Sequence, residues 1–72
     1  MKFQVLFLYD AEYDGYVAEV PELPGCLSQG KTLEEATENI RDAIVGYLAV
    51  LEKHGTPYKP NGKPTFIAEI AV

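Results

Sequence analysis

Cysteine and histidine are nearly absent from this 72-residue sequence, which contains one of each, Cys26 and His54. A single cysteine cannot form an internal disulfide, and it cannot assemble a cysteine-based metal site. A cysteine nucleophile would need a histidine to activate it, but His54 lies far along the chain near a predicted helix end. We therefore interpret Cys26 as a small buried hydrophobic residue. We expect no catalytic residue, no cofactor and no metal site, so the chain is not predicted to be an enzyme.

Basic residues are also scarce, because six lysines and arginines stand against eleven acidic residues and leave a net charge of −5. This charge argues against binding to the phosphate backbone of nucleic acids and favours a basic protein partner. Such a charge can also serve only to keep a small domain soluble. No apolar run approaches the roughly 18 residues needed to span a bilayer, and the start of the sequence lacks a signal-peptide pattern. We expect a cytoplasmic protein that binds neither membranes nor nucleic acid.

The remaining composition is that of an ordinary globular protein, with 47% hydrophobic and 24% charged residues. A chain of this length lies at the lower end of independently folding domains. A single domain over residues 1–72 is therefore predicted.

Hydrophobic patterning predicts three strands in the first part of the chain. Lys2 to Tyr9 is apolar on both faces, which is typical of a strand in the centre of a sheet. The turn dipeptide Asp14-Gly15 precedes a second strand over Tyr16 to Val20, so the two strands should form an antiparallel hairpin. A Pro24-Gly25 turn follows, in which glycine is free to take a positive φ, and Cys26 to Ser28 is a short third strand.

A long amphipathic helix is predicted after the third strand. Gly30 should end that strand, since glycine takes conformations that a β-branched residue refuses. Thr32 is a good N-cap, and Glu35 three residues later completes a capping box. The helix should stop near Lys53-His54-Gly55. The apolar stripe that should face the sheet consists of Leu33, Ala36, Ile40, Ala43, Ile44, Tyr47, Leu48 and Leu51.

A fourth strand is predicted over Thr65 to Ala71, where Phe66, Ala68 and Ile70 alternate with the residues between them. The proline-rich stretch from Thr56 to Pro64 is typical of an extended connection between the helix and this strand. The order βββαβ predicts the α+β fold class, with a three-stranded antiparallel meander and one helix packed across one sheet face.

One face of this sheet is expected to lack cover. Gln4, Leu6 and Leu8 lie on one side of the first strand, and Val45 and Ala49 lie outside the centre of the helix stripe. Soluble monomers rarely keep exposed apolar surface of this kind. We therefore expect these five residues to contact a protein partner or a second copy of the chain, in a homodimer or a higher homo-oligomer.

Several linked motifs follow one another between Gly15 and Ile40. A strand leads into a Pro-acidic-Leu-Pro-Gly-Cys turn, then a Ser-x-Gly-x-Thr connection, and then a Glu-Glu-Ala helix start that ends in Asn-Ile. Taken together, they resemble the signature of the HicB antitoxin family. The motif residues are Pro21, Leu23, Pro24, Gly25, Cys26, Ser28, Gly30, Thr32, Glu35, Ala36 and Asn39.

The resemblance implies a partial ribonuclease-H-like fold and an antitoxin of a two-component toxin–antitoxin system. It also implies a partner, a small basic HicA-like toxin that cleaves mRNA with a histidine and that the antitoxin neutralises by covering it. Many HicB antitoxins carry a C-terminal DNA-binding segment, whereas this sequence ends just after its last predicted strand, so operator binding is not expected. The alternative is a solitary HicB-related domain that binds a small ligand or another protein through its open sheet face.

The ribonuclease-H resemblance also raises the question of nuclease activity. Those enzymes place several carboxylates around two Mg²⁺ ions, one of them within the first strand. Phe3 to Phe7 carries no carboxylate. Asp10, Glu12 and Asp14 cluster in the following turn, where acidic residues are usually solvated. Nuclease activity is therefore not predicted.

Overall fold

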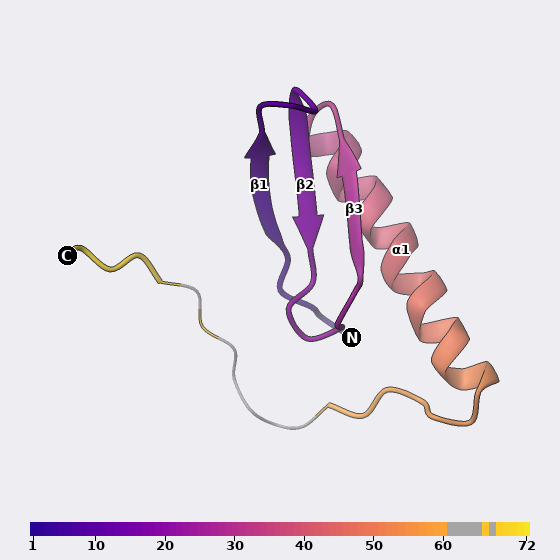
Figure 1. Cartoon of the computed structure of the whole chain (residues 1–72). Helices are drawn as coiled ribbons and strands as arrows, with labels where there is room; N and C mark the ends of the chain where they lie inside the picture. The colour runs from indigo at the N-terminus through magenta and orange to yellow at the C-terminus, as the bar shows by residue number, and fades with distance from the viewer. Residues whose placement is uncertain (61–65, 67) are drawn as a thin grey trace.

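The described part of the chain forms a three-stranded antiparallel sheet with one long helix on one face (Figure 1). The computed structural model describes residues 1–60, Phe66 and residues 68–72. The elements are β1 (Leu6–Asp10), β2 (Gly15–Glu19), β3 (Leu27–Gly30) and α1 (Leu33–Lys53). The strand order is β1-β2-β3. The α+β class, the antiparallel meander and the single helix after it are confirmed.

The first strand differs from its prediction in extent and position. β1 begins at Leu6, four residues later than predicted, and among the described residues it is an edge strand rather than a central one. Phe3 and Val5 precede the strand, yet both pack against the core. The alternation of apolar residues before Leu6 therefore arises because Phe3 and Val5 are partly buried under the helix. These two residues are not part of a strand.

The fourth strand is not confirmed. Thr65 and Ile67 lie outside the described residues, and so do residues 61–64 of the predicted connection. Phe66 and residues 68–72 are exposed and belong to no strand.

The β1–β2 turn is closed by the side chain of Asp10. Its Oδ1 accepts hydrogen bonds from the backbone N–H groups of Glu12 at 2.9 Å and Tyr13 at 3.3 Å. The left-handed conformation in this turn falls on Asp14, with φ 55°. Aspartate tolerates that conformation better than most residues, so Gly15 can begin β2, where it is buried.

The predicted cap starts the helix. Thr32 Oγ1 accepts a hydrogen bond from the Glu35 backbone N–H at 3.0 Å. In return, Glu35 Oε1 accepts from the N–H of Lys31 at 2.9 Å, one residue before the position that a standard capping box uses. At the other end, Gly55 has φ 75° and its N–H donates to the Glu52 carbonyl, while the Thr56 N–H donates to the Leu51 carbonyl. These bonds form a Schellman motif, so both predicted helix ends are confirmed.

Removing the N-cap should destabilise the protein by a measurable amount. We expect Thr32→Ala to lower the free energy of unfolding by about 1 kcal/mol, because the Glu35 N–H loses its acceptor. Urea denaturation followed by circular dichroism measures this change. Thr37→Ala is the matched control, since the Thr37 hydroxyl is exposed and donates only to the Leu33 carbonyl within the same helix. An equal loss in both variants would contradict the capping role.

The core lies between the sheet and α1. In the sheet register Phe7 lies opposite Ala18, and Ala18 lies opposite Ser28. Directly opposed residues share a face, and Ala18 has no exposed surface, so this row faces the helix. The buried hydrophobic residues are Ala18, Val20, Leu23, Cys26, Ala36 and Ile40. Leu33, predicted to belong to the buried stripe, is instead 51% exposed in the first helical turn.

The segment after the helix returns to the sheet at Tyr58. Its ring lies 5.3 Å from the Phe3 ring, centroid to centroid, and its hydroxyl donates to Glu22 Oε2 at 2.8 Å. This hydrogen bond raises the pKa of the Tyr58 phenol, because it stabilises the protonated form. The chain beyond the helix is thus tied to both the N-terminal segment and the β2–β3 loop.

Candidate functional site

The first half of the motif residues builds the β2–β3 loop. Leu23 is 1% exposed and fills the space under the loop. The N–H of Val20 donates to the Cys26 carbonyl at 3.1 Å, and the N–H of Cys26 donates to the Leu23 carbonyl at 2.9 Å. Gly25 takes the predicted positive φ, 81°, while Pro21 is exposed on the outside of the loop.

The second half of the motif fixes the helix against the loop and β3. The Tyr47 hydroxyl donates to the Pro24 carbonyl at 2.9 Å, and the Asn39 side-chain amide donates to the Gln29 carbonyl at 2.8 Å. Gly30 is buried against the first turn of α1, and Ser28 is half-buried on the helix-facing row. These motif residues therefore shape the β2–β3 loop and hold α1 against it.

The two residues considered for nucleophilic chemistry have structural positions. Cys26 is 3% exposed and belongs to the core, as predicted, and burial raises the pKa of its thiol. His54 is the C-cap of α1. Within the described ranges, no group of three or more His, Cys, Asp or Glu side chains could hold a metal ion. A separate search of the same ranges finds no helix long and apolar enough to cross a membrane.

The buried position of Cys26 predicts low reactivity. We expect thiol reagents to modify Cys26 in the folded protein about a hundredfold more slowly than in urea, because only the exposed thiolate reacts. A colourimetric disulfide reagent measures both rates. Equal modification rates in the folded protein and in urea would contradict the buried position of Cys26.

The raised pKa of the Cys26 thiol also predicts a pH dependence of stability. Above the ordinary thiol pKa, the unfolded chain loses the thiol proton while the folded chain keeps it. The free energy of unfolding should therefore fall as the pH rises through this range.

The face of the sheet opposite the helix carries a group of exposed apolar side chains. Leu6 lies opposite Glu19, which lies opposite Leu27, and Leu8 lies opposite Val17, which lies opposite Gln29. These two rows lie on either side of the helix-facing row. Successive side chains of a strand lie on opposite faces, so the side chains of these two rows point away from the helix. Leu8 is 53% exposed and Leu27 is 55% exposed. We call Leu6, Leu8, Val17 and Leu27 the open sheet face; Gln4 is exposed just before β1.

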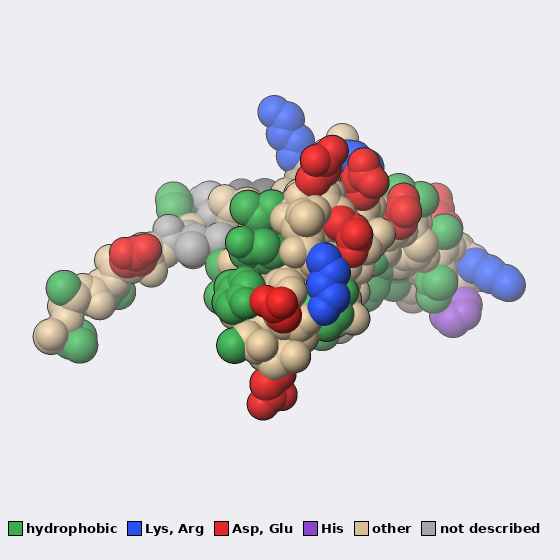
Figure 2. Space-filling model, turned by 90° about the horizontal axis from the view of Figure 1, so that it is seen from above, with side chains coloured by type: hydrophobic (Ala, Val, Ile, Leu, Met, Phe, Trp, Pro, Cys, Tyr) green, Lys and Arg blue, Asp and Glu red, His purple; other side chains and the backbone are tan. Residues whose placement is uncertain are grey.

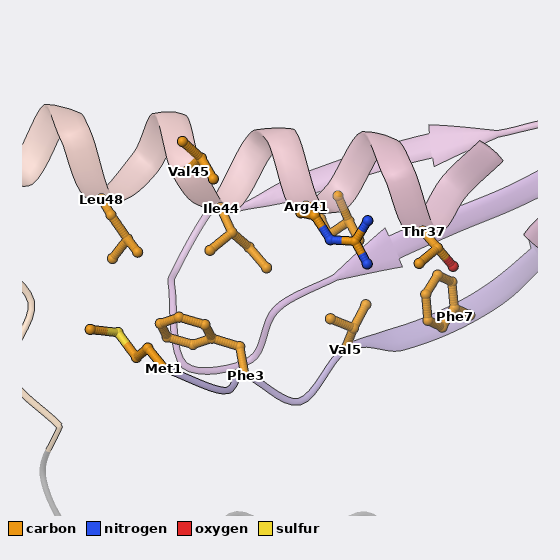
Figure 3. Close-up of a pocket in the computed structure, with 10 residues that line it drawn as sticks. Met1, Phe3, Val5, Phe7, Thr37, Arg41, Ile44, Val45 and Leu48 are labelled. Carbon is orange, nitrogen blue, oxygen red and sulfur yellow. The ribbon is translucent and has the colours of Figure 1, made fainter. Parts of the chain in front are cut away.

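A groove on the helix side of the sheet was not predicted. It has a volume of about 520 Å³ and lies between β1 with its preceding segment and α1. Figure 3 shows Phe3 and Val5 on one wall, with Ile44, Leu48 and Arg41 on the other. The signal was present in the apolar residues before β1, but that segment was interpreted as a central strand. We call this feature the β1–α1 groove.

The side of α1 that faces away from the sheet is also apolar in its second half. Val45 and Ala49, both predicted at an interface, are exposed, Val45 to 64%. Two further residues extend this surface, Gly46 and Val50, the latter 52% exposed. Val45 also lines the β1–α1 groove. The structure thus separates the predicted interface residues of β1 and its preceding segment from those of α1.

Acidic side chains concentrate at the end of the molecule where the β1–β2 turn and the start of α1 meet, and Figure 2 views this end directly. Lys31, the basic residue there, lies over the Tyr13 ring at 3.8 Å and donates to the Tyr13 carbonyl. The Tyr9 hydroxyl donates to Asp14 at 2.6 Å, and this hydrogen bond raises the pKa of Tyr9. We call this region the acidic end; its carboxylates are Asp10, Glu12, Asp14, Glu34, Glu35 and Glu38.

Comparison with known proteins gives a consistent set of relatives. A family model described as a HicB_like antitoxin of bacterial toxin-antitoxin system matches residues 3–71. A UPF0150 protein of Thermoplasma acidophilum is 51% identical over 55 residues, which is 75% of this chain and 77% of that protein. A UPF0150 protein of Synechocystis is 36% identical over 66 residues, 92% of this chain and 84% of its own. The residues that the family model matches include β1, β2, β3 and α1.

Proposed function

Because this chain belongs to the HicB-like antitoxin family of bacterial toxin–antitoxin systems, we propose that it neutralises a small basic HicA-like toxin by binding to it directly. The observation that carries this proposal is the open sheet face. Leu8 and Leu27 each leave more than half of their surface exposed there. Apolar surface of this kind supplies binding energy when a partner covers it.

The charge distribution supports the same partner. The net charge is −5, and six of the eleven acidic residues lie at the acidic end. Opposite charges steer the encounter of two proteins, while buried apolar contacts set how slowly they separate. An acidic antitoxin and a basic toxin would therefore associate fast and remain bound.

The proposed activity is occlusion rather than catalysis. The antitoxin covers the toxin, so it needs no reacting group of its own. Since the substrate of such a toxin is mRNA, the proposal places the complex in the cytoplasm. The acidic charge argues that the chain itself does not bind the RNA.

We also retain the partial ribonuclease-H-like arrangement as part of this proposal, with Thr65 to Ala71 as a fourth strand. Two features support it: β1 has no neighbour on its outer edge among the described residues, and the β1–α1 groove beside it is apolar. Phe66 and Ile70, both more than 80% exposed, are spaced to present side chains to one face of a strand. Amide hydrogen exchange tests this point, since pairing would protect the N–H groups of residues 66–71.

An RNA-cleavage assay tests the proposed function. Purified HicA-like toxin is incubated with a labelled mRNA while the chain is titrated from zero to molar excess. We expect cleavage to stop once the chain reaches equivalence with the toxin, and an unrelated acidic protein of similar size to have no effect. Full cleavage at saturating chain would contradict the proposal. Cleavage of the RNA by the chain alone with Mg²⁺ would contradict a non-enzymatic role.

A second candidate function rests on the β1–α1 groove. Its volume of about 520 Å³ falls within the range of small-molecule sites, and its walls are mainly apolar. A solitary domain could bind a small apolar ligand there. In that case native mass spectrometry of the purified protein should detect a bound small molecule, and Leu48→Asp should abolish the bound species. Absence of any bound species would count against this candidate.

A further inference from the structure

The outward side of α1 carries a continuous seam of small and oppositely charged residues. Asp42, Gly46, Ala49 and Lys53 follow one another at intervals of four, three and four residues, which places them on one face of a helix. All four are exposed. Their spacing places them on the helix face away from the buried Ala36 and Ile40, and Gly46 also lies at the edge of a pocket that Cys26 and Leu27 line. Val45 and Val50 flank them at 64% and 52% exposure. We call these four residues with their two flanking valines the outer helix seam.

Gly46 is the least expected member of this seam. Glycine is less favourable than alanine in the interior of a helix, and a Cβ added at Gly46 would meet no atom within 4 Å. Packing within the described chain therefore gives no reason for its presence. A small residue at this position does allow a second helix to approach closely, because the distance between packed helices is set by the side chains at the contact.

The charges specify which helix would fit. If a second copy of α1 lies antiparallel, with the twofold axis between Tyr47 and Leu48, Gly46 of one copy lies opposite Ala49 of the other. In the same register Asp42 lies opposite Lys53, and the symmetry produces this pair twice. A parallel arrangement would instead place Asp42 against Asp42 and Lys53 against Lys53. The outer helix seam is therefore self-complementary in the antiparallel arrangement.

We propose that two copies of this chain form a homodimer by packing their outer helix seams antiparallel. The two valines on each helix cover the partner's small residues from either side, which buries apolar surface that the monomer exposes. The sheets lie on the outside of such a dimer. Both open sheet faces remain accessible, so each dimer could bind two toxin molecules. The dimer does not depend on toxin binding, and it can be tested without a toxin.

Charge reversal combined with sedimentation equilibrium tests this dimer. We expect the wild-type chain to dimerise, and Asp42→Lys and Lys53→Asp each to raise the dimer Kd at least about tenfold, since each replaces two attractions with two repulsions. An equimolar mixture of the two variants should recover the dimer, because every Lys then meets an Asp. Ala49→Glu should abolish the dimer by placing two carboxylates where the helices are closest.

The controls separate an interface effect from misfolding. The substituted side chains are exposed, so circular dichroism and the urea midpoint should remain close to those of the wild type. Leu8→Glu, on the open sheet face, should leave the dimer unchanged. A wild-type chain that stays monomeric up to about 1 mM would overturn the proposal. A dimer that is insensitive to Ala49→Glu, or a mixture that fails to recover the dimer, would overturn it as well.

Discussion

Substituting Gly30 with alanine is expected to lower the free energy of unfolding by about 3 kcal/mol or more, which is a large part of the stability of a domain this small. A Cβ at position 30 would lie 2.3 Å from the backbone nitrogen of Ala36 and 2.8 Å from its Cα. These are backbone atoms of the first helical turn, so no side-chain rotation can relieve the contact. The helix would have to move away from β3, and the contacts of Ala36 and Ile40 with the sheet would loosen. Urea denaturation followed by circular dichroism measures the change.

Gly46→Ala is the matched control for this substitution. It is the same chemical change in the same protein, but the added Cβ meets no atom within 4 Å. Alanine is the better helix former, so we expect Gly46→Ala to stabilise the protein by about 0.5–1 kcal/mol. Similar stabilities for the two variants would show that the close approach of β3 and α1 at Gly30 does not constrain the fold.

Features determined by local chemistry were predicted well from the sequence. Thr32 and Glu35 mark the helix start because the cap forms within a few residues of chain, and Gly55 marks its end for the same reason. The positive φ of Gly25 follows from the Pro-Gly pair. Each of these structures is closed by hydrogen bonds between residues that are near neighbours in the sequence.

Features that depend on distant parts of the chain were predicted poorly. Gly30 ends β3 as predicted. The reason is its close contact with Ala36 and not conformational freedom, and only the packing of helix on sheet reveals that contact. Phe3 and Val5 were assigned to a central strand because burial beneath a helix produces the same apolar alternation. The β1–α1 groove was missed as a result.

The exposure of the candidate interface residues was predicted in part. Leu8, Val45 and Ala49 are exposed, as their positions in the strand and helix patterns indicated. Leu27 was missed, because a three-residue strand shows no clear alternation and only its pairing with Glu19 places it on the open sheet face. Val50, which is 52% exposed, was not among the predicted interface residues.

The double variant Leu8→Glu with Leu27→Glu should lose toxin binding while keeping the fold. Both leucines are more than half exposed on the open sheet face, so glutamate can be accommodated in the free protein. Each loses the apolar surface that a partner would bury, and each would bring a carboxylate into the interface. Together they should raise the Kd for a HicA-like toxin about a hundredfold or more, at roughly 1.5 kcal/mol per side chain. Isothermal titration calorimetry measures the Kd, and the urea midpoint checks the fold.

The double variant Val45→Glu with Val50→Glu is the control. It separates the effect of lost apolar contact on the toxin Kd from the effect of added negative charge. It adds the same two negative charges, and the two valines are exposed to a similar extent as the leucines, but they lie on the outer helix seam. Since the toxin is basic, extra negative charge alone should strengthen the encounter in both variants. Weaker binding in the leucine variant alone would therefore assign the contact to the open sheet face. Sedimentation of both variants accompanies the titration, because the two valines also belong to the proposed dimer interface. Equal weakening in both variants, or in neither, would mean that the toxin contacts another surface.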